Sequence, residues 1–434
     1  MSFLGIDIGT TTVCGAVLDD DGRFIESVTR DNTFLSTGIP YEKIQSPDGI
    51  VKTVREIVAE LTAKHVIHGI GLSGQMHGIL YTDKDGNAVS PLYIWQDGRG
   101  GLPYKDGKSY AEVIGAKPGY GGATHFYNTV NHLVPETAVK LCTVGDYAAM
   151  KLSGNTTPVT DVTNAASLGL FDLEKGCFDT EKIASFGIDA AMFPTVTPSF
   201  TCVGNTGNNI PVYNCIGDNQ ASFLGSVADK ERSILINIGT GSQISVYSEA
   251  YRELPHLETR PFPGGGYLHV GASLCGGRAY ALLMSFFAEA VKIATGKEIS
   301  KPYAAFEELT NALDEADLPD VKPLFCGTRE DTAVRGSITN LTEDNFTPAA
   351  MAAAMLRGIV TELYEMYAPS QDVLGERPVI VGSGNGVRSN RVMKCIVHDL
   401  FDAEFTIPVY KEEAACGAAR AAMSGAIQGG IIGC

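Results

Sequence analysis

Two short turns rich in glycine and threonine carry residue types that can hold phosphate groups. The first spans residues 9–12, Gly-Thr-Thr-Thr, and follows the apolar stretch 3–8. It offers unhindered backbone N–H groups and hydroxyls to phosphate oxygens. Asp7 lies just before the turn, where its carboxylate could serve a phosphate-bound Mg²⁺ ion. The simpler alternative is a β-hairpin whose Asp and Thr side chains only satisfy turn geometry.

The second turn repeats this arrangement later in the chain. Residues 234–247 again run from an apolar strand through a Gly-Thr turn into a second apolar strand, with Asn237 standing where the first copy has Asp7. Each copy also has a later apolar strand that ends in Gly and Ser residues, over 70–74 and 379–384. A repeated strand-turn pattern predicts two related domains, and two phosphate-holding hairpins that face one another predict a nucleotide clamp.

Asp218 is the candidate general base. It follows the apolar stretch 210–216 and opens a helix of small residues near the inferred domain boundary. There its carboxylate would face the cleft and could accept a proton from a substrate hydroxyl. The alternative is a helix N-cap, a position that Asp favours, and the two roles are compatible.

Two polar clusters at predicted strand ends suit a polyhydroxylated ligand. They are Gln75-Met76-His77 and the stretch 95–99, Trp-Gln-Asp-Gly-Arg, which contains the one Trp of the chain. Such a mixture offers side chains to hydroxyls and an apolar face to carbons. Taken singly, His77 could equally be a hydrogen-bonded, partly buried histidine, and Trp95 an ordinary core aromatic.

Two other phosphate motifs are tested by their spacing. Gly107-Lys108-Ser109 lacks the upstream glycine of a P-loop, since that position is Leu102. The segment 69–74 matches G-x-G-x-x-G, but the residues after it read as a strand, whereas a dinucleotide fold needs a helix. The pattern therefore disfavours a nicotinamide-dependent dehydrogenase.

Composition sets the class of protein. The 434 residues are 44% hydrophobic, which favours a globular chain of two to three domains. A net charge of −17 disfavours nucleic acid and anionic membranes as partners, and no apolar run reaches the roughly 18 residues of a membrane helix. Ten cysteines without a C-x-x-C pair, behind an N-terminus that lacks a secretory pattern, predict a cytoplasmic protein with reduced thiols.

Several elements are expected to carry these residues. Ser46-Pro47 and Thr347-Pro348 each predict a helix start, with an N-cap residue followed by proline. The Gly-rich stretch 100–125 is expected to be a long loop near the site. The domain boundary is expected near residues 228–232, which gives domains 1–228 and 229–434.

Together the motifs resemble the FGGY carbohydrate kinases. The matching stretches occur in the family's order and cover nearly the whole chain: 7–11, 73–78, 95–99, 217–218, 239–240 and 382–386. The stretches 119–124, 160–167 and 266–274 resemble the family members that act on sedoheptulose. The resemblance implies an α/β fold of two actin-like (ribonuclease H-like) domains, the first sugar-binding and the second nucleotide-binding, with an ATP/sugar cleft between them.

The resemblance also implies roles for individual residues. Asp218 would be the catalytic base and Asp7 the Mg²⁺-associated carboxylate. The residues expected to contact ATP are Gly9, Thr10, Thr11, Gly239, Thr240, Gly384 and Asn385. The residues expected to face the sugar are Gln75, Met76, His77, Asp97 and Asp218.

One position departs from the family. Cys14 stands seven residues after Asp7, where the family usually has Lys or Arg, so the group that neutralises the transferred phosphoryl charge is not evident. The expected activity is ATP- and Mg²⁺-dependent phosphorylation of a ketose, foremost sedoheptulose, by a protein that could form a homodimer. The alternatives are a kinase for xylulose or another ketose or polyol, and an actin-like ATPase or sugar-binding regulator without transfer activity.

Overall fold

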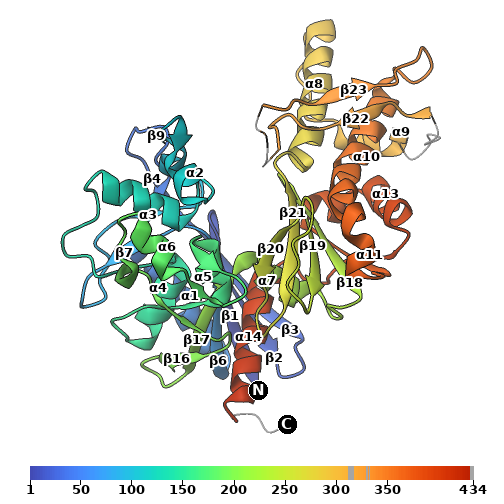
Figure 1. Cartoon of the computed structure of the whole chain (residues 1–434). Coiled ribbons are helices and arrows are strands. Elements are labelled where there is room, and N and C mark those ends of the chain that lie inside the picture. The colour runs from blue at the N-terminus through green and yellow to red at the C-terminus, as the bar shows by residue number, and fades with distance from the viewer. Residues whose placement is uncertain (311–316, 329–330, 332, 431–434) are drawn as a thin grey trace. The chain divides into compact units, whose positions relative to one another are not determined.

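A computed structural model of the chain describes residues 1–310, 317–328, 331 and 333–430 (Figure 1). The chain forms two compact units. Unit 1 comprises Met1–Ser226, Arg260–Gly266 and the segment that begins at Glu412, and unit 2 comprises Val227–Thr259 and Tyr267–Lys411. None of the described helices is both long and apolar enough to cross a membrane.

Unit 1 is built on a six-stranded sheet in the order β16-β17-β6-β1-β2-β3. β1 pairs antiparallel with β2 and parallel with β6, and β6 pairs parallel with β17. The parallel pairs bring the carboxyl ends of β1, β6 and β17 to the same edge, where Asp7, Ser73 and Gly217 lie. The strands are β1 (Ser2–Ile8), β2 (Thr12–Asp19), β3 (Phe24–Asp31), β6 (Ile67–Gly74), β16 (Cys202–Asn205) and β17 (Pro211–Gly217).

Helices cover both faces of this sheet. α1 (Pro47–Lys64) begins as predicted, with Ser46 as N-cap and Pro47 at the first position, and it packs Ile57 and Leu61 against Gly15 of β2. The opposite face carries α14 (Glu413–Gln428), the red helix beside the blue strands in Figure 1. α7 (Asp218–Ser226) packs along α14. A core of Ile, Leu and Val from β1, β6 and α1 fills the space under α1.

The fit of α14 depends on glycine. A Cβ atom on Gly5 would lie 1.8 Å from the carbonyl oxygen of Ala415, and one on Gly71 would lie 1.9 Å from that of Ala418. Only glycine lets the helix backbone approach the strands this closely. The sequence analysis assigned this helix to a C-terminal domain 229–434. The structure differs, because the glycine-lined face that accepts the helix belongs to unit 1.

The rest of unit 1 consists of short helices and strands. The predicted long loop 100–125 is wrong: it contains α2, which has a complete Ser109/Glu112 capping box, and the start of α3. The helices are α2 (Tyr110–Ile114), α3 (Gly121–Val130), α4 (Val144–Ser153), α5 (Val162–Ser167) and α6 (Thr180–Ser185), with 3-10 turns η1 (Arg99–Gly101) and η2 (Ala190–Met192). The short strands are β4 (Phe34–Leu35), β5 (Ile44–Gln45), β7 (Leu80–Thr82), β8 (Leu92–Tyr93), β9 (Pro103–Lys105), β10 (Lys108–Ser109), β11 (Lys140–Cys142), β12 (Val159–Asp161), β13 (Phe171–Asp172), β14 (Cys177–Phe178) and β15 (Thr195–Thr197).

Unit 2 has a sheet in the order β20-β21-β19-β18-β24-β25, in which the five strands β21-β19-β18-β24-β25 repeat the order β3-β2-β1-β6-β17 of unit 1. The sixth strand differs, because β16 lies beside β17 whereas β20 lies beside β21. The strands of this sheet are β18 (Ser233–Ile238), β19 (Ser242–Ser248), β20 (Glu258–Pro261), β21 (Tyr267–Ser273), β24 (Val379–Ser383) and β25 (Glu404–Thr406), and a separate ribbon consists of β22 (Asp320–Lys322) and β23 (Ser337–Thr339). The last two residues of β20 belong to unit 1. Its helices are α8 (Gly277–Thr295), α9 (Tyr303–Thr310), α10 (Pro348–Tyr367), α11 (Gln371–Leu374), α12 (Gly384–Ser389) and α13 (Arg391–Phe401), with 3-10 turn η4 (Ala368–Ser370). α10 starts with Thr347 as N-cap and Pro348 next, as predicted, and supplies much of the buried core.

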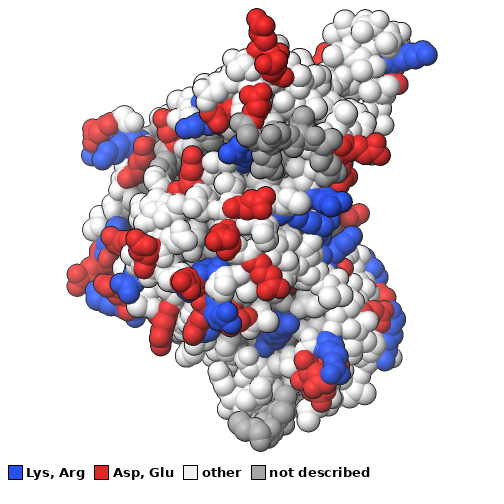
Figure 2. Space-filling model, turned by 90° about the vertical axis from the view of Figure 1, so that its right-hand side faces the viewer, with Lys and Arg blue, Asp and Glu red and all other residues white. Residues whose placement is uncertain are grey.

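Charged side chains of both signs are interspersed on the face shown in Figure 2. This mixture accords with a chain in which 50 acidic residues accompany 33 basic ones. Negative net charge repels polyanions at long range. The surface therefore does not favour nucleic acid as a partner.

Candidate functional site

The turn between β1 and β2 is braced through its carbonyl groups. The Asn32 side chain donates to the Gly9 carbonyl (3.1 Å), the Asn32 N–H donates to the Thr11 carbonyl (2.7 Å), and Gln45 Nε2 donates to the Thr10 carbonyl (2.7 Å). Because these carbonyl oxygens accept hydrogen bonds from protein donors, they do not face an anion bound at the turn. The arrangement fits the predicted phosphate-holding role of Gly9, Thr10 and Thr11.

Two carboxylates stand near one another at the carboxyl edge of the unit 1 sheet. Asp7 ends β1 and accepts a hydrogen bond from the Ser73 hydroxyl (2.8 Å), and burial raises the pKa of its carboxyl to about 6. Asp218 opens α7 and accepts from the Asn219 N–H (2.7 Å). Part of its surface reaches solvent, yet burial, and then repulsion by Asp7, raise the pKa of its carboxyl to about 7.

This pair fits the chemistry of a phosphate-bound divalent cation. The described residues contain no cluster of three or more metal-ligating side chains. Mg²⁺ commonly binds proteins through one or two carboxylates, and phosphates and water complete its shell. Asp7 and Asp218 repel one another, so a cation beside them would relieve that repulsion. Asp7 is therefore suited to the predicted metal role.

Gln75 and Met76 lie at this edge, as the sequence predicted. Gln75 is buried, donates from Nε2 to Gln45 Oε1 (2.9 Å) and accepts a long hydrogen bond from the Thr10 hydroxyl (3.5 Å). Met76 is buried, and its sulfur lies 2.8 Å from the position that a Cβ on Gly217 would take. The Gln75 side chain thus contacts the turn, and Met76 contacts the strand that leads to Asp218.

His77 follows with a left-handed backbone, at φ 73°. Its N–H donates to the Ser167 hydroxyl (3.1 Å), its Nδ1 contacts the Ser167 carbonyl (2.7 Å), and its ring stacks on Tyr120. Left-handed backbone is uncommon for a non-glycine residue and is often kept where function needs it.

Asp97 is held by protein groups on both of its carboxylate oxygens. It is 1% exposed, and Arg99 Nε donates to its Oδ1 (2.6 Å) while the Lys43 N–H donates to its Oδ2 (3.1 Å). Arg99 also contacts Glu42 and lies over the Tyr93 ring. Both carboxylate oxygens of Asp97 are thus bonded to protein, which indicates a buried ion pair that shapes the wall. Its predicted contact with sugar stays a prediction.

Arg260 is a residue at the site that the sequence analysis missed. It is 8% exposed, its Nη1 donates to Asn219 Oδ1 (3.4 Å), and its charge lowers the pKa of Asp218 against the larger opposing effects. Gln220 Nε2 donates to the Pro261 carbonyl (3.1 Å), which fastens the same segment to α7. An isolated arginine far along the chain gives no motif, so only the fold identifies it.

Cys14, the position where a basic residue was expected, lies opposite Asp7 in the β1–β2 ladder. Burial raises the pKa of its thiol to about 11, so the side chain is neutral. The nearby carboxylates receive no positive charge from this position, and Arg260 is the cation whose charge acts on Asp218.

Unit 2 brings its four predicted residues together at the end of its central strands. β18 and β24 pair in parallel, with Asn237 opposite Ser383 and a 2.6 Å hydrogen bond between their side chains. Gly384 has φ 82°, and a Cβ there would lie 2.6 Å from the Ile238 carbonyl oxygen, so this approach requires glycine. Asn385 follows in α12.

The Gly239-Thr240 turn of unit 2 is held by the start of α8. The Gly277 N–H donates to the Gly239 carbonyl (2.8 Å), and the Arg278 N–H donates to the Thr240 carbonyl (3.1 Å). The turn therefore resembles that of unit 1 in having its carbonyl groups bound by protein donors. This placement fits the predicted nucleotide-holding role, which stays a prediction for all four residues.

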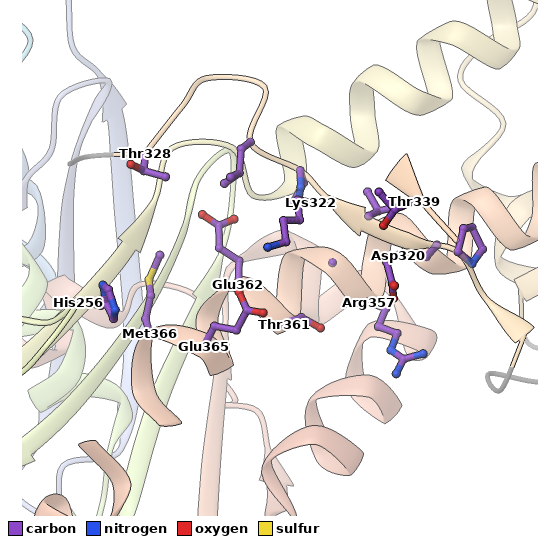
Figure 3. A pocket seen from close by; sticks show the side chains of 16 residues that line it. His256, Asp320, Lys322, Thr328, Thr339, Arg357, Thr361, Glu362, Glu365 and Met366 are labelled. Carbon is purple, nitrogen blue, oxygen red and sulfur yellow. The ribbon is translucent and has the colours of Figure 1, made fainter. Parts of the chain in front are cut away.

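A cavity of about 530 Å³ lies elsewhere in unit 2, between α10 and β22 (Figure 3). Glu362 and Glu365 reach it from α10 and Lys322 from β22, and the Glu362 carboxylate accepts from the Ser273 hydroxyl (2.8 Å). None of the predicted site residues lines this cavity. It therefore does not correspond to the predicted site.

Comparison with known proteins gives a consistent picture. Residues 2–107 and 124–225 match the FGGY family of carbohydrate kinases, N-terminal domain. Sedoheptulokinase of Homo sapiens is 27% identical over 456 residues, covering 92% of this chain and 92% of the human protein. Xylulose kinase of Staphylococcus xylosus is 24% identical, covering 97% of this chain and 90% of that protein. The crystal structure of Plasmodium falciparum glycerol kinase with ADP superposes with a TM-score of 0.82 at 18% identity, covering 100% of this chain and 90% of that one. The chain thus has the two-domain, actin-like α/β fold of these kinases.

Proposed function

Because this protein is a carbohydrate kinase of the FGGY family, we propose that it transfers the terminal phosphoryl group of ATP to the terminal hydroxyl of a ketose. The proposed substrate is sedoheptulose and the product sedoheptulose 7-phosphate. The substrate assignment is supported by the likeness to human sedoheptulokinase over most of both chains.

The observation that carries the chemistry is Asp218, with its raised pKa, beside Asp7 at the end of the sheet. A general base works best when its pKa lies near the operating pH, and the Asp218 carboxyl, at about 7, meets that condition. It would take the proton from the sugar hydroxyl while the hydroxyl oxygen attacks phosphorus. The ADP oxygen then leaves with the electron pair of the broken bond.

The other residues bind and orient. Phosphoryl transfer asks a protein mainly for positioning and charge stabilisation. The turns at Gly9–Thr11 and Gly239-Thr240 would hold phosphate oxygens through backbone N–H groups, with Gly384 and Asn385 on the adenosine side. Mg²⁺, held by Asp7 and the phosphates, would supply charge neutralisation when bound, and Arg260 would add a fixed positive charge near the base. Gln75, Met76 and His77 would face the sugar.

The test is side-by-side kinetics with pure sugars, following ADP release. We expect a higher kcat/KM for sedoheptulose than for xylulose, glycerol or aldoses. A site that hydrogen-bonds every hydroxyl of a seven-carbon sugar leaves buried polar groups unpaired when a shorter one binds. If xylulose exceeds sedoheptulose by about tenfold, or ~1.4 kcal/mol, the sedoheptulose assignment is wrong and the ketose kinase stands.

Two alternatives stay open in that experiment. Preference for xylulose or another ketose or polyol accords with the xylulose kinase relative. ATP hydrolysis that no sugar stimulates would instead indicate an ATPase or regulator without transfer activity. The expected cytoplasmic location and homodimer are separate proposals, tested by fractionation and by the mass of the protein in solution.

A further inference from the structure

Two segments without an assigned role hold the His77 ring. Ser167, at the end of α5, accepts the His77 N–H through its hydroxyl (3.1 Å) and meets Nδ1 through its carbonyl (2.7 Å). Tyr120, just before α3, stacks on the ring at a centroid distance of 4.5 Å and an interplanar angle of 13°. The His77–Tyr120–Ser167 group is called the histidine clamp below.

The clamp fixes which ring nitrogen carries the proton. A backbone carbonyl can only accept a hydrogen bond, so Nδ1 must be the donor to Ser167. In the neutral ring Nε2 is then the acceptor nitrogen. A nitrogen acceptor suits a hydroxyl donor, which is the group that a sugar offers at most of its carbons.

Both holding residues are themselves anchored. The Ser167 hydroxyl donates to the Asn164 carbonyl (2.7 Å), and Ser167 is 4% exposed. On the other side, the Gly122 N–H donates to the Leu168 carbonyl (2.7 Å), which ties the start of α3 to the end of α5. These hydrogen bonds tie Tyr120 and Ser167 to the same part of unit 1.

α5 also joins the clamp to the strand that carries the base. The Thr163 hydroxyl accepts from the Gly217 N–H (2.9 Å), and Asn164 Nδ2 donates to the Cys215 carbonyl (2.9 Å). One short helix thus contacts both His77 and the residue before Asp218. Its rigid length sets how far the His77 ring lies from the base.

We propose that Tyr120 and Ser167 are positioning residues for sugar selection, which hold the His77 ring with Nε2 as acceptor for one hydroxyl of the substrate at a set distance from Asp218. This inference rests on the proposed function for the identity of the ligand, a polyhydroxylated sugar. The placement of the ring itself is independent of that function.

The first test is a set of double-mutant cycles on sugar kinetics. Ser167→Ala removes the hydroxyl partner of His77, Tyr120→Leu removes the stacked ring, and Tyr120→Phe keeps it. We expect kcat/KM for the preferred ketose to fall about tenfold in the first two variants, with KM for ATP within about twofold of wild type. Tyr120→Phe, which keeps the stacked ring, should lose less than Tyr120→Leu.

The cycles show whether the two residues act through the histidine. In a His77→Ala background, Tyr120→Leu and Ser167→Ala should each change kcat/KM by less than about twofold, because residues that act through a shared partner are not additive. Equal losses in both backgrounds would overturn the proposal. Tyr104→Leu is the matched control, since it removes a similar stack, on Tyr110 at 4.5 Å, away from His77, and should leave the kinetics unchanged.

The second test needs no activity. Nitrogen-15 NMR of the imidazoles, with the His77 signals assigned by their absence in His77→Asn, reports which nitrogen is protonated. We expect Nδ1 to be protonated and Nε2 unprotonated, and the two forms to average when Tyr120 is replaced by Leu. Averaged or reversed signals in the wild type would overturn the clamp. If no sugar is phosphorylated, the proposed function and the ligand fall, and the spectrum alone decides the clamp.

Discussion

Replacing Asp218 by Asn is expected to stabilise the protein and inactivate it together. The fold raises the pKa of the Asp218 carboxyl from 3.8 to about 7, first through burial and then through repulsion by Asp7. Keeping this carboxylate ionised therefore costs folding free energy at neutral pH. Asn has nearly the same shape and no charge, so the variant is free of that cost.

The two pKa values set the size and the pH range of the effect. Because the folded state holds the proton more tightly, stability falls as the pH rises from the lower pKa through the higher one, and then levels off. The full difference corresponds to an upper limit of about 4 kcal/mol above ~pH 7. Since Asp218 keeps some contact with solvent, we expect roughly 2–3 kcal/mol. Below about pH 4 the two proteins should differ little.

Chemical unfolding without nucleotide, sugar or divalent cation measures this difference at about pH 5 and pH 8. Trp95 is the one Trp of the chain and lies in unit 1, so its fluorescence reports the unit that contains Asp218. Asp146→Asn is the matched control, because burial also raises the pKa of the Asp146 carboxyl to about 7, while Asp146 completes the capping box of α4 with Thr143.

The outcomes separate the two arguments. Both variants should gain stability at the higher pH, but only Asp218→Asn should lose ~10²–10⁴-fold in sugar-dependent turnover. A gain of equal size at both pH values would contradict the linkage between burial and protonation. Turnover within a few-fold of wild type would remove Asp218 from the role of base, and an equal loss in Asp146→Asn would show that the loss is not specific to it.

Three further substitutions follow from contacts described above. Arg260→Gln is expected to lower kcat by about tenfold with partial recovery in Arg260→Lys, and an unchanged kcat would show that its charge does not matter to the base. Gly71→Ala should destabilise unit 1 by about 1–3 kcal/mol, because the added Cβ would overlap the α14 backbone. A Trp95 unfolding curve that does not shift would contradict this packing. Asp97→Asn should lower the free energy of unfolding by about 3 kcal/mol, because buried Arg99 loses a charged partner. The same fluorescence measures this change, and an unchanged free energy of unfolding would contradict it.

The hairpins and helix starts could be read from sequence because their signals are local. The Gly-Thr turn after β1 and the Ser46-Pro47 cap each specify their structure within a few residues. The structure of the stretch 100–125 was harder to predict. Its glycines suggested a loop, whereas a capping box at Ser109 starts a helix within it. A short helix has too few residues to show the spacing of hydrophobic residues that is typical of a helix.

The site was predictable in part for the same reason. Residues at strand ends, such as Asp7 and Gln75, could be placed because the carboxyl ends of parallel strands meet at one edge. The sequence identified Asp97 as a candidate site residue but did not predict its ion pair with Arg99, since that contact depends on side-chain geometry. Arg260 could not be found, because what brings it to Asp218 is a long-range crossing of the chain between units.

The place of α14 has a consequence for how the protein is made. The strands that accept this helix are synthesised before unit 2, whereas the helix itself follows unit 2 in the sequence. Until it arrives, the glycine-lined face of β1 and β6 has no cover, so unit 1 cannot reach its final stability during most of synthesis. Unit 2, apart from the short segment Arg260–Gly266, has its whole sequence by Lys411. A nascent chain that stops before Glu413 should therefore present a finished unit 2 and a unit 1 that chaperones still recognise.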